Sequence, residues 1–188
     1  TTPANIFHLL RRQVKMKMRL PLVVFTPKSL LRHPHVFSTV DELAGGSFTE
    51  VIDDRFAEPE LIDNVILTSG RLFYDLCKYK LERATSNVAI IRIEQLYPLP
   101  SAQIDRLVKK YKPDKIFWVQ DEPANMGAWP MIRRKLDYLN PEPVARPESA
   151  SPAAGLMEKH VQSLQKILES VFEKKEIVSS VNNIPKCS

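Results

Sequence analysis

Three side chains that could bind an anion or carry a proton stand close together near the start of the chain. They are Lys28, Arg32 and His33, within residues 26–34 (TPKSLLRHP). The apolar residues 22–25 before them predict a buried strand, and ligands of open α/β sheets bind beside the carboxyl ends of strands. These charges would therefore face an anion or a neighbouring domain. The alternative is a proline-initiated turn that carries solvated charges.

The densest basic run of the chain lies between residues 11 and 19. It could bind an anionic effector, because guanidinium and ammonium groups form charge-assisted hydrogen bonds with phosphate and carboxylate oxygens. The alternative is that these cations only stabilise the carboxyl end of a helix. The basic residues of this run are Arg11, Arg12, Lys15, Lys17 and Arg19.

The other reactive residues do not form a complete catalytic or metal-binding set. Asp121 and Glu122 follow a predicted strand and could act as acid or base. The alternative is that they cap the following helix or pair with an arginine. His33 and His35 have no cysteine or aspartate cluster beside them. The chain has five glycines, no Gly-Asp-Gly cofactor motif and no phosphate loop. We therefore predict no catalytic, cofactor-binding or metal-binding residues here.

The composition is that of an ordinary globular protein. The 188 residues suit one domain with an appended segment, and 44% hydrophobic and 26% charged residues suit a packed core. The net charge is +5, but outside residues 11–19 the charges are mixed in sign, so we expect no nucleic-acid partner. No apolar run is long enough to cross a bilayer, so we expect no membrane partner. Cys77 and Cys187 lack metal or redox spacing and indicate a reducing, intracellular setting.

The elements that must position these groups alternate between strands and helices from residue 21 onward. Continuous apolar runs, typical of strands covered on both faces, occupy residues 22–25, 65–67, 88–93 and 116–119. Residues 48–52 alternate and predict an edge strand that could run antiparallel. We therefore expect an α/β fold: a mostly parallel open sheet of about five strands with helices on both faces.

Helical patterns fill the gaps between these strands. Thr2 and Pro3 predict the start of a first helix that ends near Lys17. We expect its apolar face to pack on something else. The side chains of that face are Ile6, Leu10 and Val14, with Phe7 beside them. Further helices are predicted at 41–44, 72–79, 104–111 with Ser101 as cap, 128–139, and from 151 onward.

Four stretches of this sequence, in order, carry a family resemblance. They are residues 2–5 (TPAN) leading to 9–13 (LLRRQ), residues 25–34 (FTPKSLLRHP), residues 92–100 (RIEQLYPLP), and residues 122–129 (EPANMGAW) with 146–153 (RPESASPA). Together they resemble the carboxyl-terminal region of the thiamine-diphosphate-dependent first component of the 2-oxoglutarate dehydrogenase complex. The likeness covers roughly residues 1–172, and the form of residues 127–129 looks bacterial.

This resemblance implies a transketolase-like homodimer of three α/β domains, with thiamine diphosphate and magnesium bound between the first two domains, upstream of this chain. The full enzyme would decarboxylate 2-oxoglutarate and pass the succinyl group to a lipoamide acyltransferase component. This chain, inactive alone and without a cofactor, would buttress the dimer. Acetyl-CoA or AMP could act as effector. The alternatives are a stand-alone nucleotide- or acyl-CoA-binding module, or the same domain of a 2-oxoadipate dehydrogenase.

The same resemblance divides the chain into three parts. Residues 1–20 would be a terminal helix and link from the preceding domain, which suits a chain that begins without Met and suggests a piece of a longer protein. Residues 21–173 would be the transketolase-like carboxyl-terminal domain. Residues 174–188 would be a tail that is disordered or of artificial origin. The enzyme would be cytoplasmic in a bacterium, or located in the mitochondrial matrix of a eukaryote.

Overall fold

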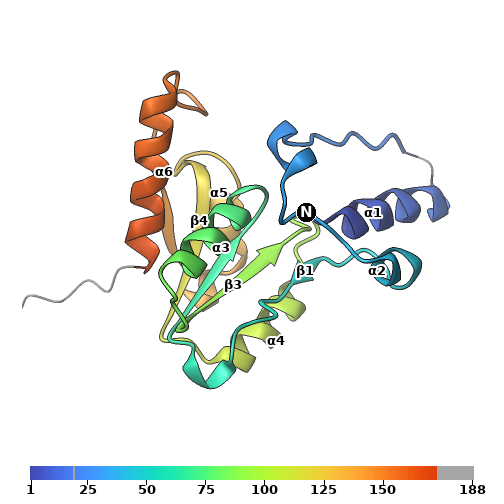
Figure 1. Cartoon of the computed structure of the whole chain (residues 1–188), viewed down its shortest axis with the longest axis horizontal. Coiled ribbons are helices and arrows are strands. Elements are labelled where there is room, and N and C mark those ends of the chain that lie inside the picture. The colour runs from blue at the N-terminus through green and yellow to red at the C-terminus, as the bar shows by residue number, and fades with distance from the viewer. Residues whose placement is uncertain (19, 173–188) are drawn as a thin grey trace, which may run out of the picture.

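The protein is built around one five-stranded sheet, seen in a computed structural model that describes residues 1–18 and 20–172 (Figure 1). The strands lie in the order β1-β3-β2-β4-β5. Four of them are parallel neighbours, and β1 runs antiparallel beside β3 at one edge. The strands are β1 (Val51–Ile52), β2 (Asn64–Thr68), β3 (Val88–Ile93), β4 (Lys115–Pro123) and β5 (Glu142–Arg146).

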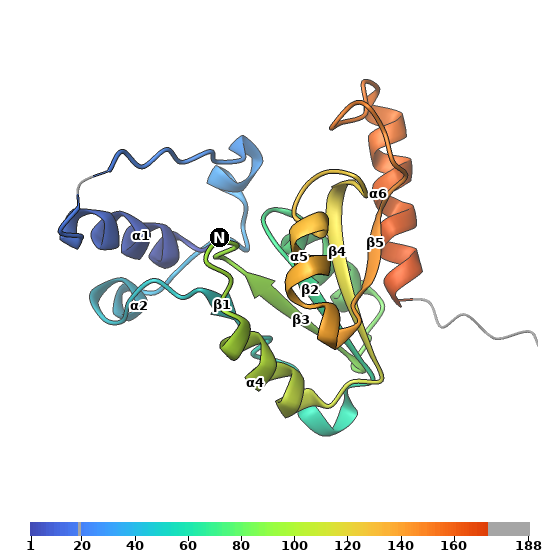
Figure 2. The same cartoon turned by 180° about the vertical axis from the view of Figure 1, so that it is seen from behind.

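Helices cover both faces of this sheet (Figures 1 and 2). On one face, α3 (Leu72–Glu82) and α6 (Met157–Phe172) pack against Ile66, Ile90 and Val119. On the other face, α4 (Ser101–Tyr111) and α5 (Trp129–Lys135) enclose the second core, which centres on Trp118. The predicted α/β fold, with a mostly parallel sheet covered on both sides, is therefore confirmed.

The central strands form because their apolar residues point to both faces. All six residues of β3 are buried, and Val65, Ile66 and Leu67 of β2 have no exposed surface. Full burial of such a side chain stabilises a fold by roughly 1.5–3 kcal/mol. The strands predicted at 65–67, 88–93 and 116–119 are confirmed, as is the antiparallel edge strand within residues 48–52.

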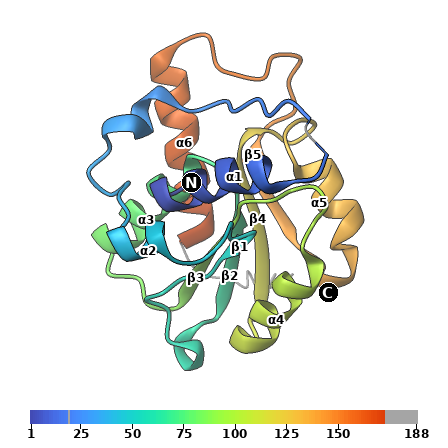
Figure 3. The same cartoon turned by 90° about the vertical axis from the view of Figure 1, so that its right-hand side faces the viewer.

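An N-terminal unit lies beyond the carboxyl end of β3 and projects from the body of the sheet (Figures 1 and 3). It contains α1 (Pro3–Lys15), the short 3-10 helix η1 (Lys28–Arg32) and α2 (Val40–Ala44). The Thr2 hydroxyl accepts a hydrogen bond from the Asn5 amide, which confirms the predicted helix start. The one-turn helix at 41–44 is also confirmed, and a reciprocal capping box of Thr39 and Glu42 begins it.

One predicted strand is wrong, and one strand of the sheet has no counterpart among the predictions. Residues 22–25 form an exposed coil between α1 and η1, because no strand in the described part of the chain pairs with them. The sequence pattern does not indicate β5, because the strand contains Pro143 and few apolar residues. Proline is tolerated there because β5 is an edge strand of the sheet.

The helix boundaries also differ in places from the predicted ones. Ser101 does not cap α4 through its side chain but is its first residue, since the helix follows Pro100 directly. The helix predicted at 128–139 is divided into two. The α-helix α5 ends at Lys135, and a separate short 3-10 helix, η3 (Asp137–Leu139), follows it. The long helix begins at 157, not 151. A further 3-10 helix, η2, spans Pro59–Leu61.

Two further observations complete the fold. Across residues 1–18 and 20–172, no helix has the length and apolarity to span a membrane. The predicted tail, residues 174–188, lies outside the described residues, so its nature stays a prediction. The division of the chain at residue 20 also stays a prediction.

Candidate functional site

A cationic groove lies between α1 and the loop that joins α2 to β1. Its volume is about 520 Å³, which is within the usual range of ligand pockets. Cationic side chains come from the helix, while the opposite wall is mostly backbone, an aromatic ring and one carboxylate. The lining residues are His8, Arg11, Arg12, Lys15, Met16, Gly46, Ser47, Phe48 and Glu50.

Polar contacts hold α1 against the opposite wall. Asn5 is buried and pairs with the backbone of Thr49, donating to its carbonyl at 3.2 Å and accepting from its amide at 2.8 Å. The Ala4 amide donates to the Ser38 hydroxyl at 3.1 Å. These bonds are all made by the first half of the helix, so its second half carries the cations over the groove.

The three cations of α1 are not neutralised by carboxylates. Arg11 donates to the Gly46 carbonyl at 3.3 Å, and Arg12 donates to the Gln95 side chain at 2.8 Å. The Arg12 guanidinium also lies 4.1 Å from the centre of the Phe48 ring. Neither these two nor Lys15 forms an ion pair with the residues described. Helical spacing places Lys15 one turn after Arg11, so the positive charges converge.

His8 also lines the groove, although the sequence did not single it out. Its ring is 4% exposed, and Nε2 donates to the Glu42 carbonyl at 2.8 Å. Nδ1 is buried without a hydrogen-bond partner among the described residues. Spacing could have identified it, because His8, Arg12 and Lys15 follow the i, i+4, i+7 pattern of one helix face. Phe48 and Glu50 had no comparable signal, because only the fold brings them to α1.

The predicted site residues separate into two groups. Arg11, Arg12 and Lys15 line the groove, while Lys17 is exposed beyond the end of α1. Arg19 lies outside the described residues. The remaining three do not line the groove and belong to η1 or follow it: Lys28, Arg32 and His33.

The η1 group does not lie at the carboxyl end of a strand here, because residues 22–25 are coil. Lys28 and Arg32 are exposed, and the His33 ring lies 5.5 Å from the Tyr74 ring. Whether these charges serve an anion or a domain contact stays a prediction.

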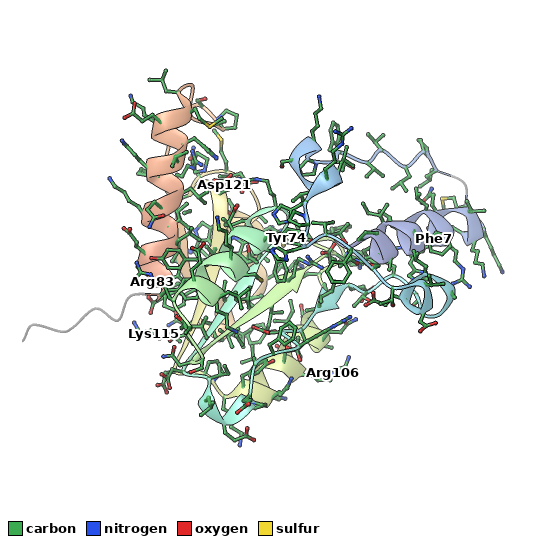
Figure 4. The ribbon with its side chains drawn as sticks, in the orientation of Figure 1. Phe7, Tyr74, Arg83, Arg106, Lys115 and Asp121 are labelled. Carbon is green, nitrogen blue, oxygen red and sulfur yellow. The ribbon has the colours of Figure 1, made fainter. Side chains whose placement is uncertain are left out.

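Asp121, the candidate acid or base, is held by two arginines at the carboxyl end of the sheet (Figure 4). Its carboxylate lies 3.1 Å from Arg71 and 2.6 Å from Arg146. Arg146 also donates to Nδ1 of His160 at 2.7 Å, which ties α6 to the end of β5. The alternative reading of Asp121, as the partner of an arginine, is therefore confirmed, and Glu122 is exposed beside it.

Asp75 provides a pH-dependent test of this network. Burial raises the pKa of Asp75 despite the nearby Arg71, 3.0 Å away. Between the ordinary carboxyl pKa and the raised pKa of the folded state, the folded protein binds more protons than the unfolded one. The contribution of Asp75 to the free energy of unfolding is therefore full below the ordinary pKa and is lost as pH rises through the folded pKa. Asp75→Asn should flatten the stability profile from about pH 4 upward, measured by urea unfolding at several pH values. The control Glu82→Gln, which removes one partner of an exposed ion pair, should leave the profile unchanged. If the unfolding free energy of Asp75→Asn depends on pH as steeply as that of the unsubstituted protein, the prediction is contradicted.

The described residues contain neither a cluster of metal ligands nor a reactive thiolate. Within residues 1–18 and 20–172, no three His, Cys, Asp or Glu side chains are grouped so as to hold a metal ion. Burial raises the pKa of Cys77 to about 12, so it is a neutral thiol at physiological pH. What the geometry offers instead is a groove lined by three cationic side chains of α1.

Comparison with known proteins identifies the family. The family described as 2-oxoglutarate dehydrogenase C-terminal matches residues 37–172. The 2-oxoglutarate dehydrogenase E1 component of Cupriavidus necator is 42% identical over 186 residues, 93% of this chain and 19% of that protein. Those of Haemophilus influenzae and Brucella anthropi are 40% and 39% identical over 92% of this chain and, again, 19% of each relative.

A solved structure, a split-gene transketolase described as an inactive beta4 tetramer, is also similar. It matches 59% of this chain and 40% of its own with a TM-score of 0.40 and 15% identity. The chain spans about a fifth of the length of the curated relatives it matches. On the family match and the sequence identity, the chain belongs to the 2-oxoglutarate dehydrogenase E1 family, of which it represents the C-terminal region.

Proposed function

We propose that this chain is the carboxyl-terminal part of an E1 subunit that decarboxylates 2-oxoglutarate and transfers the succinyl group to a lipoamide acyltransferase. The observation that carries the proposal is identity of about 40% to E1 components over more than nine-tenths of the chain. The subunit would work as a homodimer, and the bacterial relatives favour a cytoplasmic location. The role of this part is to support the rest of the subunit.

Thiamine diphosphate and magnesium, which the family implies, do not fit the described residues. A diphosphate–magnesium pair needs oxygen ligands for the metal beside a phosphate cradle. The groove offers cations and a single carboxylate, Glu50, which already accepts hydrogen bonds from Gln95 and Gln103. We therefore assign the cofactor to the preceding part of the subunit and derive no reaction step from these residues.

The assay that tests this proposal compares the 188-residue chain with the full-length subunit. With thiamine diphosphate and magnesium, the full-length protein should reduce ferricyanide in the presence of 2-oxoglutarate, and the 188-residue chain should not. Thiamine-dependent turnover by the chain alone would contradict the proposal. A full-length protein that prefers 2-oxoadipate would assign the chain to the related enzyme instead.

We also propose that the cationic groove binds an anionic adenine-nucleotide effector, such as AMP or acetyl-CoA. The supporting observations are three cations without carboxylate partners, a volume of about 520 Å³ and the Phe48 ring beside Arg12. Aromatic rings and arginine side chains are the groups on which nucleic-acid bases stack in proteins, and the Arg12–Phe48 pair supplies both at the groove. Lys28, Arg32 and His33 are not part of this proposal, because they do not line the groove.

Calorimetric titration of AMP and acetyl-CoA into the full-length subunit tests the groove. The double variant Arg11→Gln, Lys15→Gln should weaken binding at least about tenfold, since each charge-assisted hydrogen bond contributes about 1.5–3 kcal/mol. Arg106→Gln, on the exposed side of α4, is the matched control and should leave affinity unchanged (Figure 4). No heat with either ligand, or an equal loss in the control, would remove the effector proposal.

A further inference from the structure

The first turns of α6, residues 157–162, are attached differently from the rest of that helix. Its apolar contacts are made by the second half, where Ile167, Leu168 and Val171 are buried against α3 and the sheet. The side chains of the first turns are exposed, apart from His160, which is half-buried. These turns extend beyond the end of α3 (Figures 1 and 3). The contact of His160 therefore determines how the first turns are held.

His160 accepts a hydrogen bond from Arg146, the last residue of β5. The distance between the Arg146 Nη2 and the His160 Nδ1 is 2.7 Å. A guanidinium group has only donors, so Nδ1 must supply a lone pair, and the ring is neutral with its proton on Nε2. The Ser163 hydroxyl, by contrast, bonds to the carbonyls of Lys159 and His160 and stays within α6. The bond to Arg146 thus joins the first turns to the sheet.

Arg146 is fixed by the sheet, so the histidine ring is the partner that can move. The Arg146 side chain is 9% exposed, and its Nη2 lies 2.6 Å from the Asp121 carboxylate. Its Nε is buried as well, without a hydrogen-bond partner among the described residues. His160 lies on helical turns that water reaches. When the bond breaks, the ring can be solvated, while the guanidinium stays on Asp121.

The charged groups around the ring leave no free carboxylate for a protonated histidine. Both oxygens of Asp121 already accept from an arginine, at 2.6 Å from Arg146 and 3.1 Å from Arg71. Asp75 pairs with Arg71 at 3.0 Å. The charged and titratable groups concerned are Arg146 on β5, Asp121 on β4, Arg71 and Asp75 at the start of α3, His33 near Asp75, and Glu158 and Lys159 on α6 itself.

We propose that the bond between Arg146 and His160 is an acid-released latch, which a proton on Nδ1 breaks, so that the first turns of α6 leave the sheet. The proton occupies the lone pair that Arg146 needs, and it places two cations side by side. Imidazole is the side chain that ordinarily changes its charge between about pH 5 and 8, so acidification within this range operates the latch. The inference does not rest on the proposed function, because every residue of the latch lies in this chain.

The latch also determines how residues 147–156 are anchored. The Ser149 amide donates to the Asn125 side chain at 3.1 Å, and the Ser149 carbonyl accepts from it at 3.0 Å. With the latch closed, the segment is held at both ends. With the latch open, it is held at Ser149 alone, and the exposed apolar side chains of Met157 and Val161 move with the freed turns.

Hydrogen–deuterium exchange of the 188-residue chain at about pH 7.5 and about pH 5 tests the latch. Exchange is compared as protection factors, which remove the direct effect of pH on the chemical exchange rate. At the lower pH, the amides of residues 160–164 should lose at least about tenfold in protection, because the closed latch contributes a hydrogen bond to a charged group. The amides of residues 168–171, which belong to the packed half, should keep theirs. Equal protection of residues 160–164 at both pH values, or an equal loss in both halves, would overturn the proposal.

A matched pair of histidine variants assigns the effect to one ring. Glutamine gains no proton in this range and can still accept from Arg146 through Oε1. His160→Gln should therefore keep residues 160–164 protected at both pH values. His35→Gln, which replaces an exposed histidine in the N-terminal unit, should retain the loss at low pH. A loss that persists in His160→Gln would contradict the latch.

The protonation state of the ring gives a second readout in the unsubstituted chain. Heteronuclear NMR of His160 at about pH 7.5 should show a neutral ring with its proton on Nε2. As pH falls, the loss of protection at residues 160–164 should follow the protonation of Nδ1. A proton on Nδ1 at about pH 7.5, or a loss that does not track the ring, would count against the proposal.

Discussion

Replacing Arg92 with methionine is expected to lower the free energy of unfolding of this chain by about 3–5 kcal/mol. Arg92 is 2% exposed at the carboxyl end of β3, inside an otherwise apolar run. Its Nε lies 2.6 Å from Glu94 in an ion pair that lacks hydrogen-bond alignment, and another nitrogen donates to the Tyr74 hydroxyl at 3.3 Å. The guanidinium also lies 4.2 Å from the Phe73 ring centre.

The large effect arises from what the substitution leaves behind. Glu94 has a side chain only 9% exposed, so without Arg92 a largely buried carboxylate loses its ion-pair partner. The double variant Arg92→Met, Glu94→Gln should therefore be more stable than Arg92→Met alone. Arg55→Met, which breaks an exposed pair with Glu42, should cost at most about 1 kcal/mol. Urea unfolding of the unsubstituted chain and the three variants measures these differences in free energy. Equal losses of unfolding free energy for Arg92→Met and Arg55→Met would refute the prediction.

The second large effect is expected at Gln120, where an alanine should destabilise the chain by about 3–5 kcal/mol. The Gln120 side chain accepts hydrogen bonds from the indole of Trp118 at 2.8 Å and the amide of Trp129 at 2.9 Å. It donates to the carbonyls of Pro123 at 3.0 Å and Met126 at 2.8 Å. Trp118 has no exposed surface, so its N–H would be left unsatisfied.

Gly127 tests the same turn from the other side. Its φ is +65°, and a Cβ there would lie 3.0 Å from the Gln120 amide. Gly70 also has a positive φ, +73°, but a Cβ there meets nothing within 4 Å. Gly70→Ala should therefore cost only the backbone strain of about 1–2 kcal/mol, and Gly127→Ala clearly more. Thermal unfolding compares the two variants. Identical losses would show that Gln120 can move aside and does not fix the turn.

These predictions concern residues that sequence patterns do not mark. The run 88–93 predicts a strand correctly, but nothing in it indicates that the charged side chain of Arg92 is buried. Its stability there depends on Glu94, Tyr74 and Phe73, which meet it only in the folded chain. In the same way, Gly127 belongs to the family-like stretch 122–129 and Gln120 lies just before it, but their contact is visible only in the folded turn.

The candidate site was predictable in part. The cations of α1 follow from local sequence, because the helix start and the spacing of Arg11 and Lys15 are both local properties. The wall opposite them comes from residues 46–50, more than 30 positions later, and no local pattern links the two. Likewise, only the tertiary structure shows that residues 28–33 do not line the groove.

The sequence by itself determined the α/β class, the three central strands, the first helix and the family, because these depend on local periodicity and on ordered motifs. Tertiary structure alone decided which apolar run joins this sheet. Residues 22–25 are as apolar as β2, yet they lie exposed, because a strand needs a partner edge as well as a suitable sequence. Residues 142–146 show the converse. They are poor in apolar residues, but β4 supplies an edge with which they pair.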